Sequence, residues 1–243
     1  MSMVILNERF LKGQKFLAIF FVLCAGAVFS PHAQTGPEED WVTPGRAAVQ
    51  RELGYARALA PDIQTKLAVI SEIREKARSG GVPADDQNTL RLLRYLAEEG
   101  TRNLAQNQRF AAKSFPEARR ASCEVLGFVG GQTSREILLD VLKADPEPMV
   151  LSEAVFALGK ITAEPDEEII LALRVLLKTK ILVPGGDNNL AMALLGTIEK
   201  LVDSKTGLRD ERLFGGLLLM LEAPLSQSVR QKTRRLIGKM TGF

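Results

Sequence analysis

Two consecutive stretches of this chain resemble each other: residues 115–144 read FPEARRASCEVLGFVGGQTSREILLDVLKA, and residues 145–179 read DPEPMVLSEAVFALGKITAEPDEEIILALRVLLKT. When Leu126-Gly127 is superposed on Leu158-Gly159, 32 residues later, the surrounding apolar positions also coincide. Each stretch has the apolar spacing of two successive helices, and self-similarity at this period predicts hairpins that bury their apolar faces only by stacking. The pattern therefore predicts an all-α fold, an α-solenoid of stacked antiparallel helix pairs.

The same signature continues less regularly toward the carboxyl terminus. Leu195-Gly196 follows with a glycine-to-glycine spacing of 37 residues, and Ile237-Gly238 follows 42 residues later. Glycine inside a helix costs roughly 1 kcal/mol relative to alanine, so Gly127 and Gly159 predict close helix crossings. The last helix, expected over residues 226–240, has no partner in the pattern, and its polar outer face is typical of a terminal helix.

The patterns divide the chain into a leader over residues 1–33, a linker over 34–44, N-terminal helices with a degenerate repeat over 45–114, and a repeat domain over 115–243. Within the N-terminal helices, Asp62 is expected to cap a helix that ends at Gly80-Gly81. Residues 101–114 are interpreted as an insertion. In the repeat domain, Gly215-Gly216 predicts a further close approach between helices.

The leader has the form of a secretory signal peptide. Three basic residues precede the apolar run FLAIFFVLCAGAVFS, residues 16–30, which is of signal-peptide length and short for a membrane span. Small residues at two places suit cleavage, so the mature chain is expected to begin between Val28 and Gln34. We therefore expect an exported protein of the periplasm or extracytoplasmic envelope.

Two alternatives for the leader stay open at this point. Cys24 is the residue that would carry lipid in a lipoprotein, although bulky Leu23 stands before it, where such signals prefer a small residue. The leader would otherwise remain uncleaved as an anchor.

Composition favours packed helices and disfavours a nucleic-acid partner. The chain is 46% hydrophobic but only 6% aromatic, which indicates a core of Leu, Ile, Val and Ala. The formal net charge is +3, and without the leader 29 basic residues face 28 acidic ones. A body this close to neutral lacks the basic excess typical of nucleic-acid binding.

Histidine and cysteine usage argues against most catalytic sites. His32 is the only histidine, and Cys123 is the only cysteine after the leader. A single histidine in or beside the leader argues against Ser-His and Cys-His catalysis and imidazole zinc sites, and a single cysteine after the leader cannot form an intramolecular disulfide. Cys123 is interpreted as a buried core thiol. No cofactor and no metal is expected, and an enzyme would need a carboxylate-only site that no pattern locates.

Acidic and glycine-rich connectors are explained by helix building. The segments 145–148 and 164–168 place prolines between helices and acids in first turns, and they lack the spacing of a calcium loop. The segment 184–189 is glycine-rich without the Lys-Ser or Lys-Thr of a phosphate loop, so Asp187 or Asn188 is expected to cap the next helix.

Residues 145–161, DPEPMVLSEAVFALGKI, resemble a HEAT repeat, particularly the short HEAT-like type of phycobilisome lyases, and PEARRASCEVLGFVG at residues 116–130 is a second match. The resemblance implies a HEAT-like superhelix that binds or scaffolds other proteins. Catalytic members of the family use His-Glu pairs, which this chain lacks, so no enzymatic activity is carried over. The repeat domain is accordingly a HEAT-like repeat domain.

One group of residues stands out as a candidate contact site. The last helix carries five basic side chains, which suit an anionic membrane surface or an acidic partner as well as a solvated terminal face: Arg230, Lys232, Arg234, Arg235 and Lys239. Arg119-Arg120, two cations at the start of a helix, also suggest a surface role. The preferred hypothesis is an exported, non-enzymatic protein-binding scaffold. The alternative is a peripheral envelope protein docked on anionic membrane.

Overall fold

The computed structural model describes residues 38–101, 115–204 and 207–242, with side chains from residue 48 onward. The chain divides into two compact units, residues 1–47 and 48–243. The expected leader and the expected insertion at 101–114 lie outside the described residues, except for Thr101. No helix in the described ranges is long and apolar enough to span a membrane.

Helix α2 (Glu38–Ala58) begins earlier than the predicted start at Gly45, so it includes most of the stretch interpreted as a linker.

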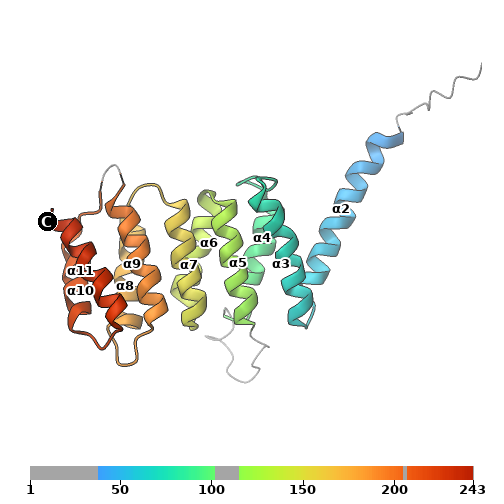
Figure 1. Ribbon diagram of the computed structural model, residues 1–243. Coiled ribbons are helices and arrows are strands. Elements are labelled where there is room, and N and C mark those ends of the chain that lie inside the picture. Colours follow the sequence, from blue (N-terminus) through green and yellow to red (C-terminus); the bar gives the residue numbers. More distant parts are fainter. Residues whose placement is uncertain (1–37, 102–114, 205–206, 243) are drawn as a thin grey trace, which may run out of the picture. The chain divides into compact units, whose positions relative to one another are not determined.

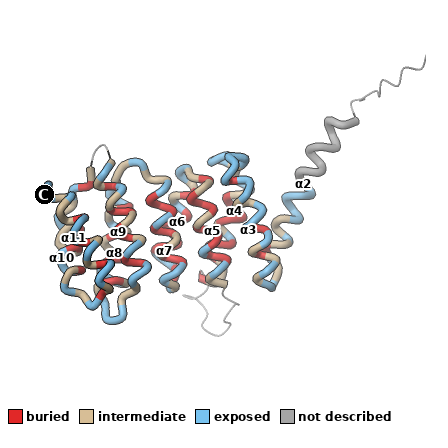
Figure 2. Tube along the Cα trace, viewed as in Figure 1, coloured by how far each residue is buried: buried red, intermediate tan, exposed pale blue. Residues whose placement is uncertain are grey.

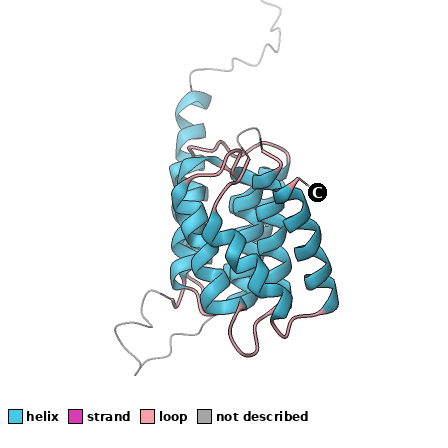
Figure 3. Cartoon of the chain, turned by 90° about the vertical axis from the view of Figure 1, so that its left-hand side faces the viewer, coloured by secondary structure: helices cyan, strands magenta, loops and turns pink. Residues whose placement is uncertain are grey.

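The unit 48–243 is built from two layers of helices, and the described ranges contain no strand (Figure 1). In the first layer each helix packs on the next, in the order α3 (Ile63–Arg78), α5 (Pro116–Val129), α7 (Pro148–Ile161), α9 (Asn188–Val202), α11 (Gln227–Thr241). The second layer packs in the same way, in the order α4 (Gln87–Glu98), α6 (Gly131–Ala144), α8 (Glu167–Leu176), α10 (Glu211–Glu222). Helix α8 continues into a π-helical segment, η1 (Leu177–Ile181). Figure 3, turned toward the α10–α11 end, shows helices and loops only. This succession of hairpins is a HEAT-like α-solenoid, as predicted.

Aspartates begin most of these helices. Their carboxylates accept hydrogen bonds from backbone N–H groups of the first turn in five cases: Asp62 for α3, Asp86 for α4, Asp166 for α8, Asp187 for α9 and Asp210 for α10. Such caps satisfy donors that a helix cannot satisfy itself. The predicted capping roles of Asp62 and Asp187 are thus confirmed, and Gly80 has the positive φ of a helix exit.

Buried residues occur on every helix from α3 to α11 (Figure 2). The four helices that share the glycine signature lie together in the first layer. Cys123 and Val155, at equivalent positions in α5 and α7, are both fully buried. Met192, at the equivalent position in α9, is 37% exposed instead.

Glycines mark the close crossings of the first layer, as predicted. A Cβ added at Gly127 would lie 2.9 Å from Cβ of Ala157, and one at Gly159 would lie 2.6 Å from Oγ1 of Thr197. The Thr197 hydroxyl in turn donates to the carbonyl oxygen of Val155 at 2.9 Å. Helices α7 and α9 thus approach closely enough for a hydrogen bond between a side chain of one and the backbone of the other.

The Gly215-Gly216 pair behaves differently at its two positions. An added Cβ at Gly216 would collide with Cδ2 of Leu177, whereas nothing lies within 4 Å of such an atom at Gly215. The predicted close approach is therefore confirmed at Gly216, where α10 meets η1, and is wrong at Gly215.

Alanine at position 159 tests the close crossing. The added methyl group would press on Thr197, which is stiff at χ1 and bonded to α7. Although alanine is the better helix former, we expect Gly159→Ala to lower the free energy of unfolding by about 1–3 kcal/mol, the typical cost of overpacking. In urea denaturation the control Gly215→Ala should raise that free energy by about 0.5–1 kcal/mol. Equal effects of the two substitutions would contradict this account.

Candidate interaction surface

A buried ion pair fixes the connection between α6 and α7. Nε of Arg119 lies 2.6 Å from Oδ2 of Asp145, and both side chains are only 1% exposed. Asp145 also accepts from the backbone N–H of Glu147 at 2.9 Å. The suggested surface role is therefore wrong for Arg119, because its guanidinium compensates a carboxylate inside the connector.

Arg119→Met should be strongly destabilising, because it leaves the Asp145 carboxylate buried without its cation. Breaking one partner of a buried pair costs about 3–5 kcal/mol. The neighbouring Arg120 is a matched control, since it is half exposed and lies 3.5 Å from Glu153. Arg120→Met should cost less than about 1 kcal/mol. Urea denaturation measures the free energy of unfolding of both variants. Similar losses of this free energy in Arg119→Met and Arg120→Met would refute a structural role specific to Arg119.

The other acidic connectors are also engaged by arginines. Arg135 of α6 lies 2.7 Å from Asp166 and 3.1 Å from Glu168, at the start of α8. Arg174 of α8 lies 3.3 Å from Asp210, at the start of α10. Within the described residues no group of acids, cysteines or histidines is arranged to hold a metal ion. The acids of these connectors cap and join helices.

Cys123 has the environment of a core thiol. It is fully buried and free, as predicted. Burial raises the pKa of its thiol, so the reactive thiolate is disfavoured.

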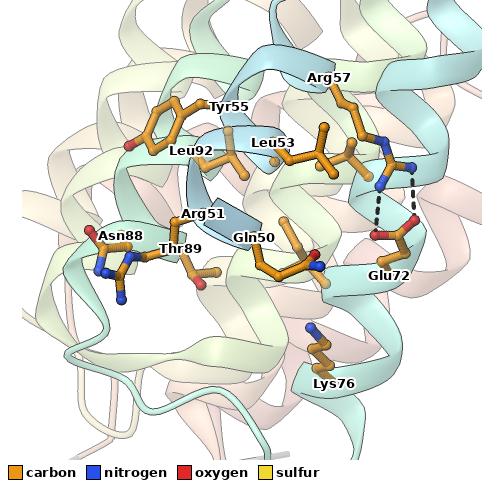
Figure 4. A pocket seen from close by; sticks show the side chains of 13 residues that line it. Gln50, Arg51, Leu53, Tyr55, Arg57, Glu72, Lys76, Asn88, Thr89 and Leu92 are labelled. Carbon is orange, nitrogen blue, oxygen red and sulfur yellow. Dashed lines mark hydrogen bonds and ion pairs between the residues drawn. The ribbon is translucent and has the colours of Figure 1, made fainter. Parts of the chain in front are cut away.

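One cleft opens between the end of α2 and the first hairpin, with a volume of about 200 Å³ (Figure 4). Apolar side chains such as Leu53 and Leu92 line one part of it. At its edge, Arg57 donates to both carboxylate oxygens of Glu72, at 2.8 and 3.0 Å. These bonds raise the pKa of Arg57 and lower that of Glu72. The pair holds α2 against α3, and no sequence pattern indicated this cleft.

The structure divides the five basic residues of α11 into two groups. Lys232 lies 3.1 Å from Glu199, and Lys239 lies 3.1 Å from Glu199 and 2.8 Å from Asp203, so these two lysines join α11 to α9. Their hydrogen bonds lower the pKa of Glu199. The other three make no ion pair with any described residue: Arg230, Arg234 and Arg235.

Exposed positions on α11 are polar throughout, as expected for a terminal helix. They include Gln231, Arg234 and Arg235, whereas Val229 and Leu236 face the core. The terminal face is thus solvated, and its three arginines are available for contact.

The second layer exposes apolar side chains on two helices that pack on each other. Leu171 and Val175 of α8 are both 49% exposed, and Leu219 of α10 is 57% exposed. Sequence reasoning predicted both helices but did not identify this exposed surface. One exposed leucine is unremarkable, but several on adjacent helices indicate a contact surface.

The two-layer fold and these exposed faces define a repeat protein of the HEAT-like solenoid class. In comparison with known families, the family described as HEAT repeats matches residues 107–180, which overlaps the segment of strongest internal repetition. The match supports the HEAT repeat family, whose repeats commonly serve as protein-interaction scaffolds. Among curated proteins, none matches this chain.

Proposed function

We propose that this chain is an exported, non-enzymatic α-solenoid that acts as a protein-binding or scaffolding module. Export rests on the apolar run at residues 16–30 and its basic flank. The absence of enzymatic activity rests on His32 as the only histidine and on the burial of Cys123. The fold supports the binding role, because solenoids present extended surfaces to other proteins.

The observation that carries the proposal is the apolar outer side of α8 and α10. Leu171, Val175 and Leu219 each expose about half of their surface. Full burial of such a side chain contributes about 1.5–3 kcal/mol, so covering the exposed half contributes roughly 1 kcal/mol each. A protein partner is the occupant that covers adjacent helices together.

The double variant Leu171→Gln/Leu219→Gln should lose partner binding. We expect wild-type protein to recover a stoichiometric partner from an envelope extract, and the double variant to recover at least tenfold less, as measured by quantitative mass spectrometry. Leu59→Gln is the control, since Leu59 is 58% exposed and lies between α2 and α3, at the start of the helix succession. Undiminished recovery by the double variant, or no stoichiometric partner under mild conditions, would contradict the proposal.

A second candidate function is docking on an anionic membrane surface through α11. It is favoured by Arg230, Arg234 and Arg235, which have no ion pair within the described residues. Lys232 and Lys239 belong to the same predicted contact site but contribute less to membrane attraction, because Glu199 and Asp203 already compensate their charge. Each basic residue near an anionic surface adds about 1 kcal/mol of attraction.

Vesicle sedimentation tests this second function. Replacing the three arginines with glutamine should weaken binding to phosphatidylglycerol-containing vesicles more than tenfold, and added salt should weaken wild-type binding. The charge-matched control replaces Lys178, Lys180 and Arg212, which lie on η1 and α10. Binding that is absent, insensitive to salt or equally reduced by the control would refute membrane docking through α11.

A further inference from the structure

Rings and cations alternate across the first layer on α5, α7 and α9. Nζ of Lys160 lies 4.4 Å from the ring centre of Phe128 and 4.6 Å from that of Phe156. Nζ of Lys200 lies 5.4 Å from the Phe156 ring and donates to the carbonyl oxygen of Gly159 at 3.2 Å. We name Phe128, Phe156, Lys160 and Lys200 the aromatic–lysine strip.

The two lysines of the strip are exposed, and no acid among the described residues forms an ion pair with either of them. Glu153 attracts Lys160 electrostatically, but its ion pair is with Arg120. Several other cations of this layer are paired, such as Arg78 with Glu124 at 3.2 Å. The attraction between a lysine ammonium group and an aromatic ring is about 0.5–1 kcal/mol at an exposed site, and it does not neutralise the positive charge. The rings thus hold the ammonium groups in position, which reduces the entropy lost when an anion binds.

The spacing of the lysines selects the form of an anionic ligand. Nζ of Lys160 and Nζ of Lys200 lie 4.6 and 5.4 Å from the same Phe156 ring centre, so the two ammonium groups are at most about 10 Å apart. A polyproline II segment repeats every three residues and rises about 3.1 Å per residue, so residues i and i+3 face the same side about 9 Å apart. Two acidic side chains at positions i and i+3 of such a segment are therefore spaced to reach the ammonium groups of Lys160 and Lys200. Phe156, 45% exposed between them, offers an apolar contact.

An acid close to the strip disfavours a uniformly anionic ligand. Glu153, on α7 with Lys160, is partly exposed and interacts electrostatically with Lys160, and its ion pair with the half-exposed Arg120 is 3.5 Å long. A lipid surface or a nucleic acid would bring negative charge against this carboxylate as well as against the lysines. A peptide with neutral residues between its acids avoids that repulsion.

We propose that the aromatic–lysine strip binds an extended segment of a protein partner with acidic residues three positions apart. The strip lies on the first layer, so this inference goes beyond the apolar surface of α8 and α10 and does not depend on it. The protein would then have two binding faces of different chemistry.

Fluorescence anisotropy with labelled synthetic peptides tests the proposal. The probe places glutamate at every third position of a proline background, and a second peptide carries lysine at the same positions. Wild-type protein should bind the acidic probe in a salt-sensitive manner and should not bind the basic one. Lys160→Gln/Lys200→Gln should weaken binding at least tenfold, whereas the charge-matched control Lys178→Gln/Arg212→Gln should stay within twofold of wild type.

Further variants keep the result interpretable. Lys160→Arg/Lys200→Arg preserves both charges and should bind within about threefold of wild type, and thermal melting checks the fold of every variant. Leu171→Gln/Leu219→Gln should bind the probe normally, so failure of the apolar site and failure of the strip are distinguishable. The proposal is overturned if the acidic probe does not bind or if Lys160→Gln/Lys200→Gln leaves its binding unchanged. It is also overturned if the strip lysines mediate binding to anionic vesicles but not to the peptide.

Discussion

The close crossing of α7 and α9 is the contact on which much of the first layer depends. Neither helix can bury its apolar side alone, and Gly159 lets the two backbones approach until Thr197 bonds to the carbonyl of Val155. In the same crossing, Nζ of Lys200 donates to the carbonyl oxygen of Gly159 and lies over the Phe156 ring. The crossing therefore packs the two helices and also positions a cation. The helix-propensity cost of Gly159 is offset by these contacts.

Charge in this protein is used mainly to join helices. The Arg119–Asp145 pair is buried in a connector, and Asp166 and Asp210 each cap a helix while pairing with an arginine of the preceding second-layer helix. Carboxylates committed in this way are not free to act as catalytic acids or bases. Lys160 and Lys200, which lie over aromatic rings, and the three arginines grouped on α11 are among the cations that join no helices, and their grouping suggests contact with another molecule.

The sequence predicted the helices well because helix signals are local. An opening proline and apolar residues at helical spacing predict a helix over residues 148–161, and α7 has these bounds, Pro148–Ile161. Prediction failed where the environment is set by distant residues. Arg119 was expected at the surface because a cation at the start of a helix is unfavourable there, and this argument uses only neighbouring residues. Its partner Asp145 lies in a connector further along the chain, and no local pattern links the two. The start of α2 was placed too late because prolines and glycines in that stretch indicated a linker.

The candidate surfaces were less predictable for the same physical reason. Helical spacing places Ala154 and Leu158 in the core and leaves Phe156 outside it, so the exposure of that ring follows from the sequence pattern. Its contact with Lys200 does not, because the register between α7 and α9 depends on how closely Gly159 and Thr197 meet. Once that register is known, the two layers differ in chemistry: one presents lysines over rings, and the other presents leucines and a valine. A scaffold that binds one segment on each face would hold both at high effective concentration, so modest affinities at each would suffice for a stable assembly.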